Sequence, residues 1–225
     1  MKRYVIIVAG GSGQRMHSHT PKQFLLLCGK PILMHTVEKF AGFGVVVVLP
    51  QEHINYWQQL CQQYAFSLTH SVTAGGGTRL ESVMNGLRLV PDDALVAVHD
   101  GVRPLVTRQM IEEGFRVAET YGNAVPVVPL ADSLRHLSHG DSSAVPREEY
   151  RLVQTPQIFR AAEIKDAYTA IAHSVGQTSL TDDASVLEAA GKRVFLYDGC
   201  PENIKITTPQ DLILAQSYYA EYQRL

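Results

Sequence analysis

Glycines and two cations follow the first apolar segment of the sequence. Residues 2–9 (KRYVIIVA) are typical of a buried strand, and residues 10–16 (GGSGQRM) follow it directly. Arg15 lies within this glycine-rich turn and Lys22 lies shortly after it. Backbone N–H groups of such a turn can surround a phosphate, and the cations would neutralise its charge. We therefore predict a phosphate-binding loop at this position.

This loop matches neither of the two commonest phosphate-binding patterns. The P-loop needs a Lys-Ser/Thr pair after its second glycine, and the dinucleotide fingerprint needs a glycine where Met16 stands. On the glycines alone, a flexible turn without a ligand is the alternative interpretation. The presence of Arg15 and Lys22 favours phosphate binding.

A carboxylate and two further cations follow other predicted strands. Asp100 in isolation is equally typical of a turn, but beside phosphates one carboxylate is what a Mg²⁺ ion held mainly by those phosphates needs. Arg103 and Lys205, with Arg15 and Lys22, put four cations at one edge of the predicted sheet. A protein of net charge −2 would not gather them without an anionic ligand.

The elements that must position these side chains alternate between strands and helices. Predicted strands cover residues 2–9, 45–49, 67–72, 95–99, 124–128, 152–159, 193–197 and 203–206. Predicted helices cover residues 31–41, 52–64, 80–87, 107–121, 161–173, 181–190 and 208–222. Alternation of this kind predicts an α/β fold with a mostly parallel, doubly wound sheet. Ligands of such sheets bind beyond the carboxyl ends of the strands, where the glycine loop, a second glycine cluster at residues 75–77 and Asp100 converge.

The alternation breaks between residues 131 and 150 (ADSLRHLSHGDSSAVPREEY), a polar stretch around a Gly-Asp pair. Its short mixed runs indicate a protruding β-hairpin arm rather than a core element. Just before it, Pro126 predicts a free edge or a bulge in its strand. We expect a single domain over residues 1–225, with an arm at about residues 131–152.

Composition excludes several classes of protein. The net charge of −2 argues against a general nucleic-acid or membrane binder, and no stretch approaches the roughly 18 apolar residues of a membrane span. Cys28, Cys61 and Cys200 are scattered, which disfavours a zinc site or a disulfide framework and suits a reducing cytoplasm. His99 is expected to be a packed residue at a strand end, and no histidine is assigned a role.

Several segments resemble, in order and spacing, one family over nearly the whole chain: the 2-C-methyl-D-erythritol 4-phosphate cytidylyltransferases of the non-mevalonate isoprenoid pathway. The segments are AGGSGQRM, PKQ, GGGTRLESV, VHDGVRP, PREEYRLVQTPQIF, TDDAS and ENIKIT. The resemblance implies a Rossmann-like nucleotidyltransferase fold, Mg²⁺ as cofactor, and a cytoplasmic homodimer. It also implies the reaction of CTP with a polyol phosphate to give a CDP-alcohol and pyrophosphate.

The resemblance implies roles for residues on the nucleotide side. Those that would hold CTP along the first loop are Ala9, Gly10, Gly11, Ser12 and Gly13. Arg15 and Lys22 would grip its phosphates and stabilise the transition state, while Gly76 and Ser82 would contact cytosine and ribose. Asp100 would bind Mg²⁺. Gly77 stands where the family commonly has an acidic residue near the base.

On the acceptor side, Arg103, Thr155 and Lys205 would position the acceptor phosphate. From the arm, Ser133 and Arg147 would reach into the active site of the other subunit of the homodimer. Ser133 stands where the family often has threonine, which keeps the hydroxyl. The catalytic residues implied are thus Arg15, Lys22, Arg147 and Lys205.

The reaction suits these residue types. The nucleophile is a phosphate oxygen, and because the second pKa of a phosphate monoester is roughly 6, it needs no general base. Catalysis then requires neutralising charge on the reacting phosphorus and the departing pyrophosphate, which Arg, Lys and Mg²⁺ provide.

Three alternatives remain open. Ribitol-5-phosphate cytidylyltransferases share the fold and most of the motifs, and only the acceptor differs. A sugar-1-phosphate uridylyltransferase and a non-catalytic nucleotide-binding module are more distant. The retained charged positions argue against the last.

Overall fold

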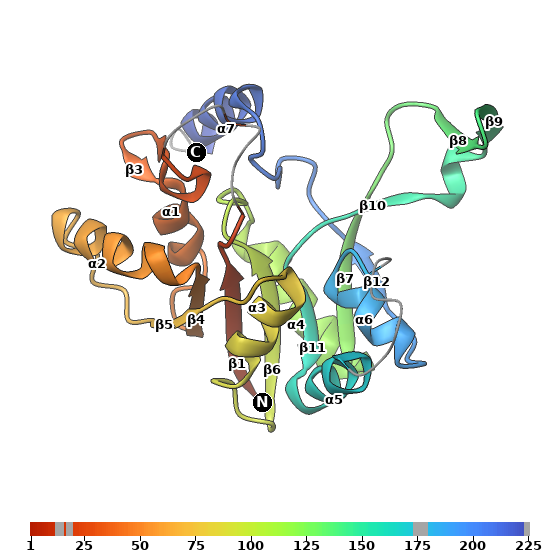
Figure 1. Cartoon of the computed structure of the whole chain (residues 1–225). Coiled ribbons are helices and arrows are strands. Elements are labelled where there is room, and N and C mark those ends of the chain that lie inside the picture. Colours follow the sequence, from red (N-terminus) through yellow and green to blue (C-terminus); the bar gives the residue numbers. More distant parts are fainter. Residues whose placement is uncertain (12–15, 17–19, 173–179, 223–225) are drawn as a thin grey trace.

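A mostly parallel sheet forms the centre of the computed structural model, which describes residues 1–11, 16, 20–172 and 180–222. The strand order is β10-β7-β11-β6-β1-β4-β5, with β12 paired to β7 (Figure 1). β11 and β10 run antiparallel to their neighbours, and the other pairings of this sheet are parallel. The strands are β1 Lys2–Val8, β4 Gly44–Leu49, β5 Ser71–Ala74, β6 Ala94–Asp100, β7 Asn123–Pro129, β10 Arg151–Val153, β11 Gln157–Arg160 and β12 Leu196–Asp198.

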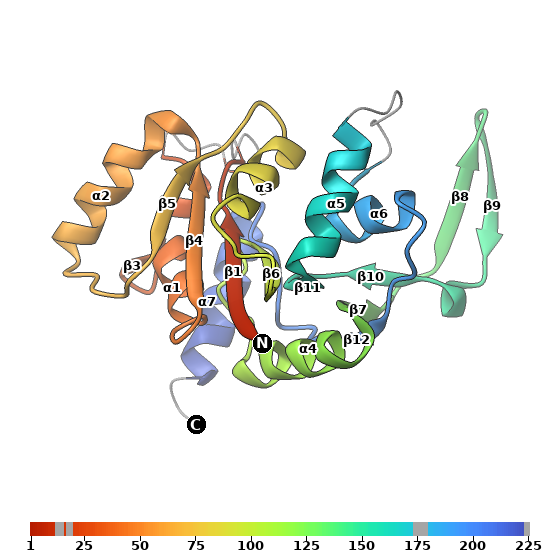
Figure 2. The same cartoon turned by 90° about the horizontal axis from the view of Figure 1, so that it is seen from below.

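Helices cover both faces of the sheet, as predicted. On one face, α1 Ile32–Glu38, α2 Ile54–Gln63 and α4 Arg108–Tyr121 share an apolar cluster with the strands. On the other, α3 Arg79–Leu87, α5 Ala161–Ala172 and α6 Asp183–Ala189 share a second (Figure 2). The last helix, α7 Pro209–Tyr222, packs over the short hairpin of β2 Leu26–Leu27 and β3 Lys30–Pro31.

The continuous apolar runs of the sequence explain the two-sided core. Successive side chains of a strand point to opposite faces of the sheet. In β4, Val45 and Val47 accordingly join the first cluster, while Val46 and Val48 join the second. Both faces of the strand are buried, which is why its sequence reads as VVVV rather than alternating with polar residues.

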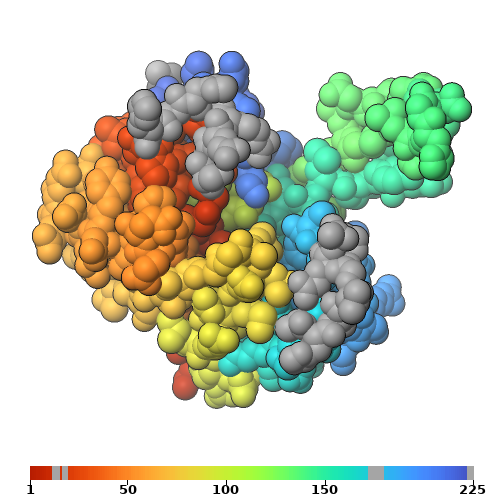
Figure 3. All heavy atoms as spheres, viewed as in Figure 1, coloured from red at the N-terminus to blue at the C-terminus, as the bar shows by residue number. Residues whose placement is uncertain are grey.

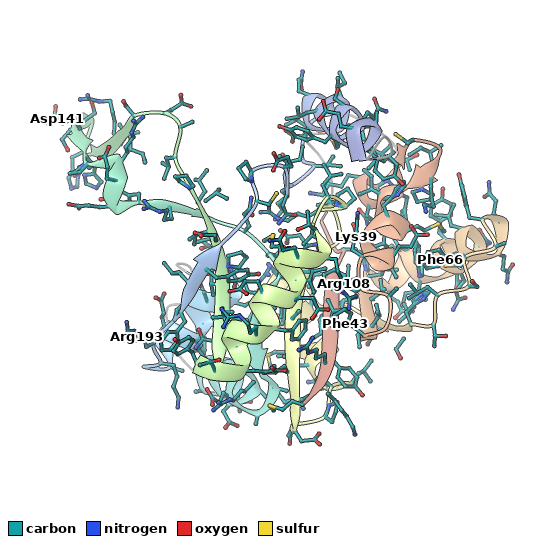
Figure 4. The ribbon with its side chains drawn as sticks, turned by 180° about the vertical axis from the view of Figure 1, so that it is seen from behind. Lys39, Phe43, Phe66, Arg108, Asp141 and Arg193 are labelled. Carbon is teal, nitrogen blue, oxygen red and sulfur yellow. The ribbon has the colours of Figure 1, made fainter. Side chains whose placement is uncertain are left out.

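Helix α4 begins and ends where its sequence indicates. The hydroxyl of Thr107 accepts a hydrogen bond from the Met110 N–H at 3.2 Å, so Thr107 is the N-cap as predicted. Gly122 ends the helix with a φ of 94°, a conformation that glycine adopts without strain. Figure 4 shows Arg108, the first residue of α4, beside Phe43, where its guanidinium lies 4.9 Å from the ring centroid.

The prediction of a single strand over residues 152–159 is wrong, because the structure has two strands there, β10 and β11, with an irregular segment between them. β10 and β11 both pair with β7, but Val153 lies opposite Val127 and Ile158 opposite Ala124. Four residues, 154–157, therefore lie opposite two, which is a bulge. It contains a cis peptide bond before Pro156. A free edge or a bulge was predicted in the strand of Pro126. Pro126 lies opposite this segment, so the irregularity is in the partner of its strand and not in β7 itself.

Two further strand predictions differ from the structure. Residues 203–206 form no strand; the segment is irregular and is tied to the turn after β6 by the Ile206 N–H, which donates to the Val102 carbonyl at 2.9 Å. The strand predicted at residues 67–72 is β5, and it lies at Ser71–Ala74.

The polar stretch after β7 forms a hairpin arm of β8 Leu134–Ser138 and β9 Asp141–Val145. The arm stands clear of the rest of the molecule in Figure 3, and Figure 4 labels Asp141 near its tip. Within the residues described, no helix is long and apolar enough to cross a membrane.

Candidate active site

The first glycine loop and the turn after Asp100 start side by side at the same edge of the sheet. β1 and β6 are neighbours, and Val8 pairs with Asp100. The Gly101 N–H donates to the Val8 carbonyl at 2.8 Å. A Cβ at Gly101 would lie 2.8 Å from the Ala9 Cβ, so glycine is needed for this close approach. The convergence predicted from the order of strands is therefore present.

A cavity of about 300 Å³ opens between the first glycine loop and the second glycine cluster. The described residues predicted for the nucleotide all line it: Ala9, Gly10, Gly11, Lys22, Gly76, Ser82 and Asp100. Ser12, Gly13 and Arg15 lie outside the described residues. The predicted nucleotide residues that are described are thus brought together in one place.

The second glycine cluster is fixed by the start of α3. The Ser82 hydroxyl donates to the Thr78 carbonyl at 2.8 Å and accepts from the Gly76 N–H at 3.1 Å. Thr78 and Glu81 form a capping box at the same end of the helix. A Cβ at Gly76 would lie only 2.3 Å from the Glu81 Cβ. Ser82 therefore supports the loop as well as lining the cavity.

A second cavity of about 250 Å³ adjoins the first. Arg103 and Thr155, both predicted for the acceptor phosphate, line it together with the bulge residue Gln154. Asp100 and Lys205 line both cavities, as does Arg79. Asp100, Lys205 and Arg79 therefore form the boundary between the larger and the smaller cavity.

Asp100 is the electrostatic centre of this boundary. Its Oδ2 lies 3.1 Å from Lys205 Nζ and 3.1 Å from Arg103 Nε. Burial alone would raise the pKa of the Asp100 carboxyl, but Lys205 and Arg103 outweigh it and hold that pKa well below its usual range. Arg103 Nη1 also donates to the Asn203 carbonyl at 2.7 Å. Asp100 is therefore ionised at neutral pH and holds both cations at the cavities.

His99 and Thr155 connect the bulge to Asp100 through a buried hydrogen-bond chain. His99 Nε2 lies 3.1 Å from the Arg103 carbonyl, which can only accept, so Nε2 carries the proton. Nδ1 then accepts from the Thr155 hydroxyl at 3.0 Å, and that hydroxyl accepts from the Asp100 N–H at 3.1 Å. Burial lowers the pKa of His99 from 6.5 to about 4, so the ring is neutral at pH 7. His99 is a packed residue as predicted, and it is also part of the site's framework.

Arg79 is a site residue that the sequence reasoning missed. Its Nη1 and Nη2 lie 3.0 and 2.6 Å from the two carboxylate oxygens of Asp183, a bidentate pair. Asp183 is fully buried and also accepts from the Tyr168 hydroxyl. A cation that follows a glycine cluster, as Arg15 does in the first loop, was a signal that could have indicated Arg79.

Ser133 and Arg147 lie away from both cavities of their own chain. Arg147 is on the arm, where its Nη1 donates to the Ala131 carbonyl at 2.7 Å. Neither Ser133 nor Arg147 is among the described residues that line the two cavities. Their predicted role in the other subunit of a dimer stays a prediction. Likewise, the described residues hold no group of three or more His, Cys, Asp or Glu side chains suited to a metal ion.

The sequence matches the family described as "IspD: 2-C-methyl-D-erythritol 4-phosphate cytidylyltransferase" over residues 4–221. A protein of that name from Porphyromonas gingivalis is 50% identical over 218 residues, 96% of this chain and 96% of that protein. Its namesake from Bacteroides thetaiotaomicron is 50% identical over 219 residues, 94% of this chain and 97% of that protein.

Solved structures agree with these similarities. The crystal structure of the 2-C-methyl-D-erythritol 4-phosphate cytidylyltransferase from Thermus thermophilus superimposes with a TM-score of 0.81 at 33% identity, covering 98% of this chain and all of that one. The Anaerococcus prevotii 4-diphosphocytidyl-2C-methyl-D-erythritol synthase has a TM-score of 0.83 at 23% identity over 97% of this chain and 98% of that one, a likeness of fold.

Proposed function

This chain belongs to the 2-C-methyl-D-erythritol 4-phosphate cytidylyltransferase family, and we propose how its two cavities divide the family's reaction. It transfers CMP from CTP to 2-C-methyl-D-erythritol 4-phosphate, giving the CDP-alcohol and pyrophosphate in isoprenoid precursor biosynthesis. The first cavity takes CTP and the adjoining polar cavity takes the acceptor phosphate. The observation that carries this division is the boundary of Asp100, Lys205 and Arg79 that both cavities share.

The chemistry at this boundary is an in-line displacement at phosphorus. An oxygen of the acceptor phosphate bonds to the α-phosphorus of CTP, and the bond from that phosphorus to the β-phosphate bridging oxygen breaks, releasing pyrophosphate. Since the attacking phosphate is already ionised, the site needs no base. Lys22, beside the glycine loop, binds the CTP phosphates, while Arg103 and Lys205 hold the acceptor. Ser12, Gly13 and Arg15 complete the nucleotide loop in this proposal.

Magnesium fits the residues at the boundary. Mg²⁺ is commonly held by one or two carboxylates together with substrate phosphates rather than by a protein cage. Asp100 supplies an ionised carboxylate. Arg103 and Lys205 both bind the same oxygen of that carboxylate, Oδ2. Bound there, Mg²⁺ would offset the negative charge of the triphosphate. Removing divalent cations with a chelator should abolish pyrophosphate release, and adding MgCl₂ should restore it.

We propose that the active unit is a homodimer in the cytoplasm. The arm and the nearby strands expose large apolar side chains to solvent, which is typical of an interaction surface. Leu137 on the arm is 77% exposed and Leu152 on β10 is 54% exposed. A partner would cover them and would bring its Ser133 and Arg147 to the acceptor cavity. A sizing column run over a range of protein concentrations tests the dimer.

The identity of the acceptor is tested by pyrophosphate release. The enzyme, CTP and MgCl₂ are mixed with 2-C-methyl-D-erythritol 4-phosphate or with ribitol 5-phosphate at equal concentrations. We expect kcat/KM to favour the methylerythritol phosphate. A preference for ribitol 5-phosphate would assign the other acceptor, and CTP binding without pyrophosphate release would leave only a nucleotide-binding module.

A further inference from the structure

Gln23 is a buried residue at the wall of the larger cavity. It follows Lys22 in the one-turn 3-10 helix Lys22–Phe24 and is 0% exposed, yet it lines the larger cavity. Within residues 1–11, 16, 20–172 and 180–222, neither its Nε2 nor its Oε1 has a hydrogen-bond partner.

Gln157, a second fully buried glutamine among the residues described, shows how such a group is satisfied elsewhere in the fold. Gln157 is also 0% exposed, but its Nε2 donates to Asp182 Oδ2 at 2.7 Å and its Oε1 accepts from the Ala184 N–H at 2.8 Å. A buried amide without partners destabilises the folded protein, since it loses its bonds to water and gains none. Gln23 is therefore a poor choice for packing alone, where methionine has a similar size and no polar atoms to satisfy.

We propose that Gln23 is a further nucleotide-binding residue, whose side-chain amide turns from its buried position toward the cavity and gains its hydrogen bonds from bound CTP. The inference rests on the proposed function and adds a residue to the same cavity. An amide complements the neighbouring Lys22, because a lysine only donates whereas an amide both donates and accepts. A nucleoside triphosphate offers both kinds of partner: phosphate and ribose oxygens accept, and the ribose hydroxyls and the cytosine amino group donate.

Two opposite effects of one substitution test this proposal. Gln23→Met removes the amide and keeps the approximate shape. In the absence of nucleotide, we expect its melting temperature to equal or exceed that of the wild type. In titration calorimetry with CTP and MgCl₂, we expect its Kd to rise at least tenfold. The matched control is Gln157→Met, which removes a buried amide with partners, and its melting temperature should fall.

The outcomes separate this inference from the function itself. If wild-type protein does not bind CTP, the proposed function fails. If wild-type protein binds CTP and Gln23→Met binds it equally well, the inference about Gln23 alone is wrong. Loss of folding or a lowered melting temperature in Gln23→Met would also overturn it, because the amide would then be hydrogen-bonded without nucleotide.

A second measurement does not depend on the variant. In ¹⁵N-labelled wild-type protein, the side-chain NH₂ resonances of Gln23, assigned by their absence in Gln23→Met, should shift when CTP is added. Unchanged resonances at saturating CTP would contradict the proposal.

Discussion

Replacing Thr155 with valine removes one hydroxyl from the centre of the site while keeping its shape. In the folded protein this hydroxyl donates to His99 Nδ1 at 3.0 Å and accepts from the Asp100 N–H at 3.1 Å. Its only proton is engaged with His99, so in the nucleotide-free protein the hydroxyl cannot donate to an acceptor phosphate. Thr155 therefore supports Asp100 and His99 first, and any contact with substrate requires it to leave His99.

The expected cost follows from the groups that valine leaves behind. Two buried polar groups, the Asp100 N–H and His99 Nδ1, lose their partners. Each such group costs roughly 1–3 kcal/mol, so Thr155→Val should lower the free energy of unfolding by about 2–6 kcal/mol. Thr155→Ser keeps the hydroxyl and loses one methyl group, which costs about 1 kcal/mol.

The assay is urea unfolding of the wild type and both variants at pH 7, followed by kcat and KM for the acceptor. The difference between the wild type and the valine variant isolates the hydroxyl, and the serine variant, which keeps the hydroxyl, is the control. We expect serine to keep most of the activity and valine to lose it, because the Asp100 backbone N–H and His99 lose the partner that positions them beside the cavities. If Thr155→Val unfolds at the same urea concentration as Thr155→Ser, the proposed hydrogen-bond chain is wrong.

Three further predictions concern charge. Lys22→Ala and Lys205→Met should fold normally but lose on the order of 10²–10³ in kcat, as when one charge-stabilising donor is removed, and wild-type turnover in either would refute its assigned role. Arg79→Met should lower the free energy of unfolding in urea by roughly 3–5 kcal/mol, because it leaves the buried Asp183 carboxylate unpaired; an unchanged midpoint would contradict this. The pKa of His99 falls from 6.5 to about 4 on folding, so between pH 6.5 and pH 4 the unfolded chain binds more protons than the folded protein. The free energy of unfolding should therefore fall by about 3 kcal/mol as the pH is lowered from above 6.5 toward 4. This pH dependence should shrink in His99→Asn.

The elements that carry strong local signals were predictable from the sequence. The apolar runs at residues 2–9 and 45–49 predicted buried strands, and the structure has β1 and β4 there. Thr107 predicted the start of α4, because an N-cap is a property of a few adjacent residues. Strand order then brought the glycine loop and Asp100 to one edge, since parallel strands present their carboxyl ends together.

What the sequence missed depends on residues that are distant along the chain. The bulge at residues 154–157 is defined by the register against β7, so the run LVQTPQIF reads locally as one strand. The segment at residues 203–206 is held by contacts with Val102 and Arg103 rather than by strand pairing. The pair of Arg79 and Asp183 joins positions 104 residues apart. No local pattern encodes such long-range partners.

The claim that CMP is transferred to the phosphate of the acceptor is tested most directly by ³¹P NMR of a single reaction. Wild-type enzyme, CTP, MgCl₂ and 2-C-methyl-D-erythritol 4-phosphate are incubated together and the phosphorus resonances are followed. We predict that the phosphomonoester resonance of the acceptor is replaced by a pair of coupled diphosphate resonances, with an equal amount of pyrophosphate. An acceptor resonance that persists while CTP is consumed, or the release of inorganic phosphate in place of pyrophosphate, would contradict the account.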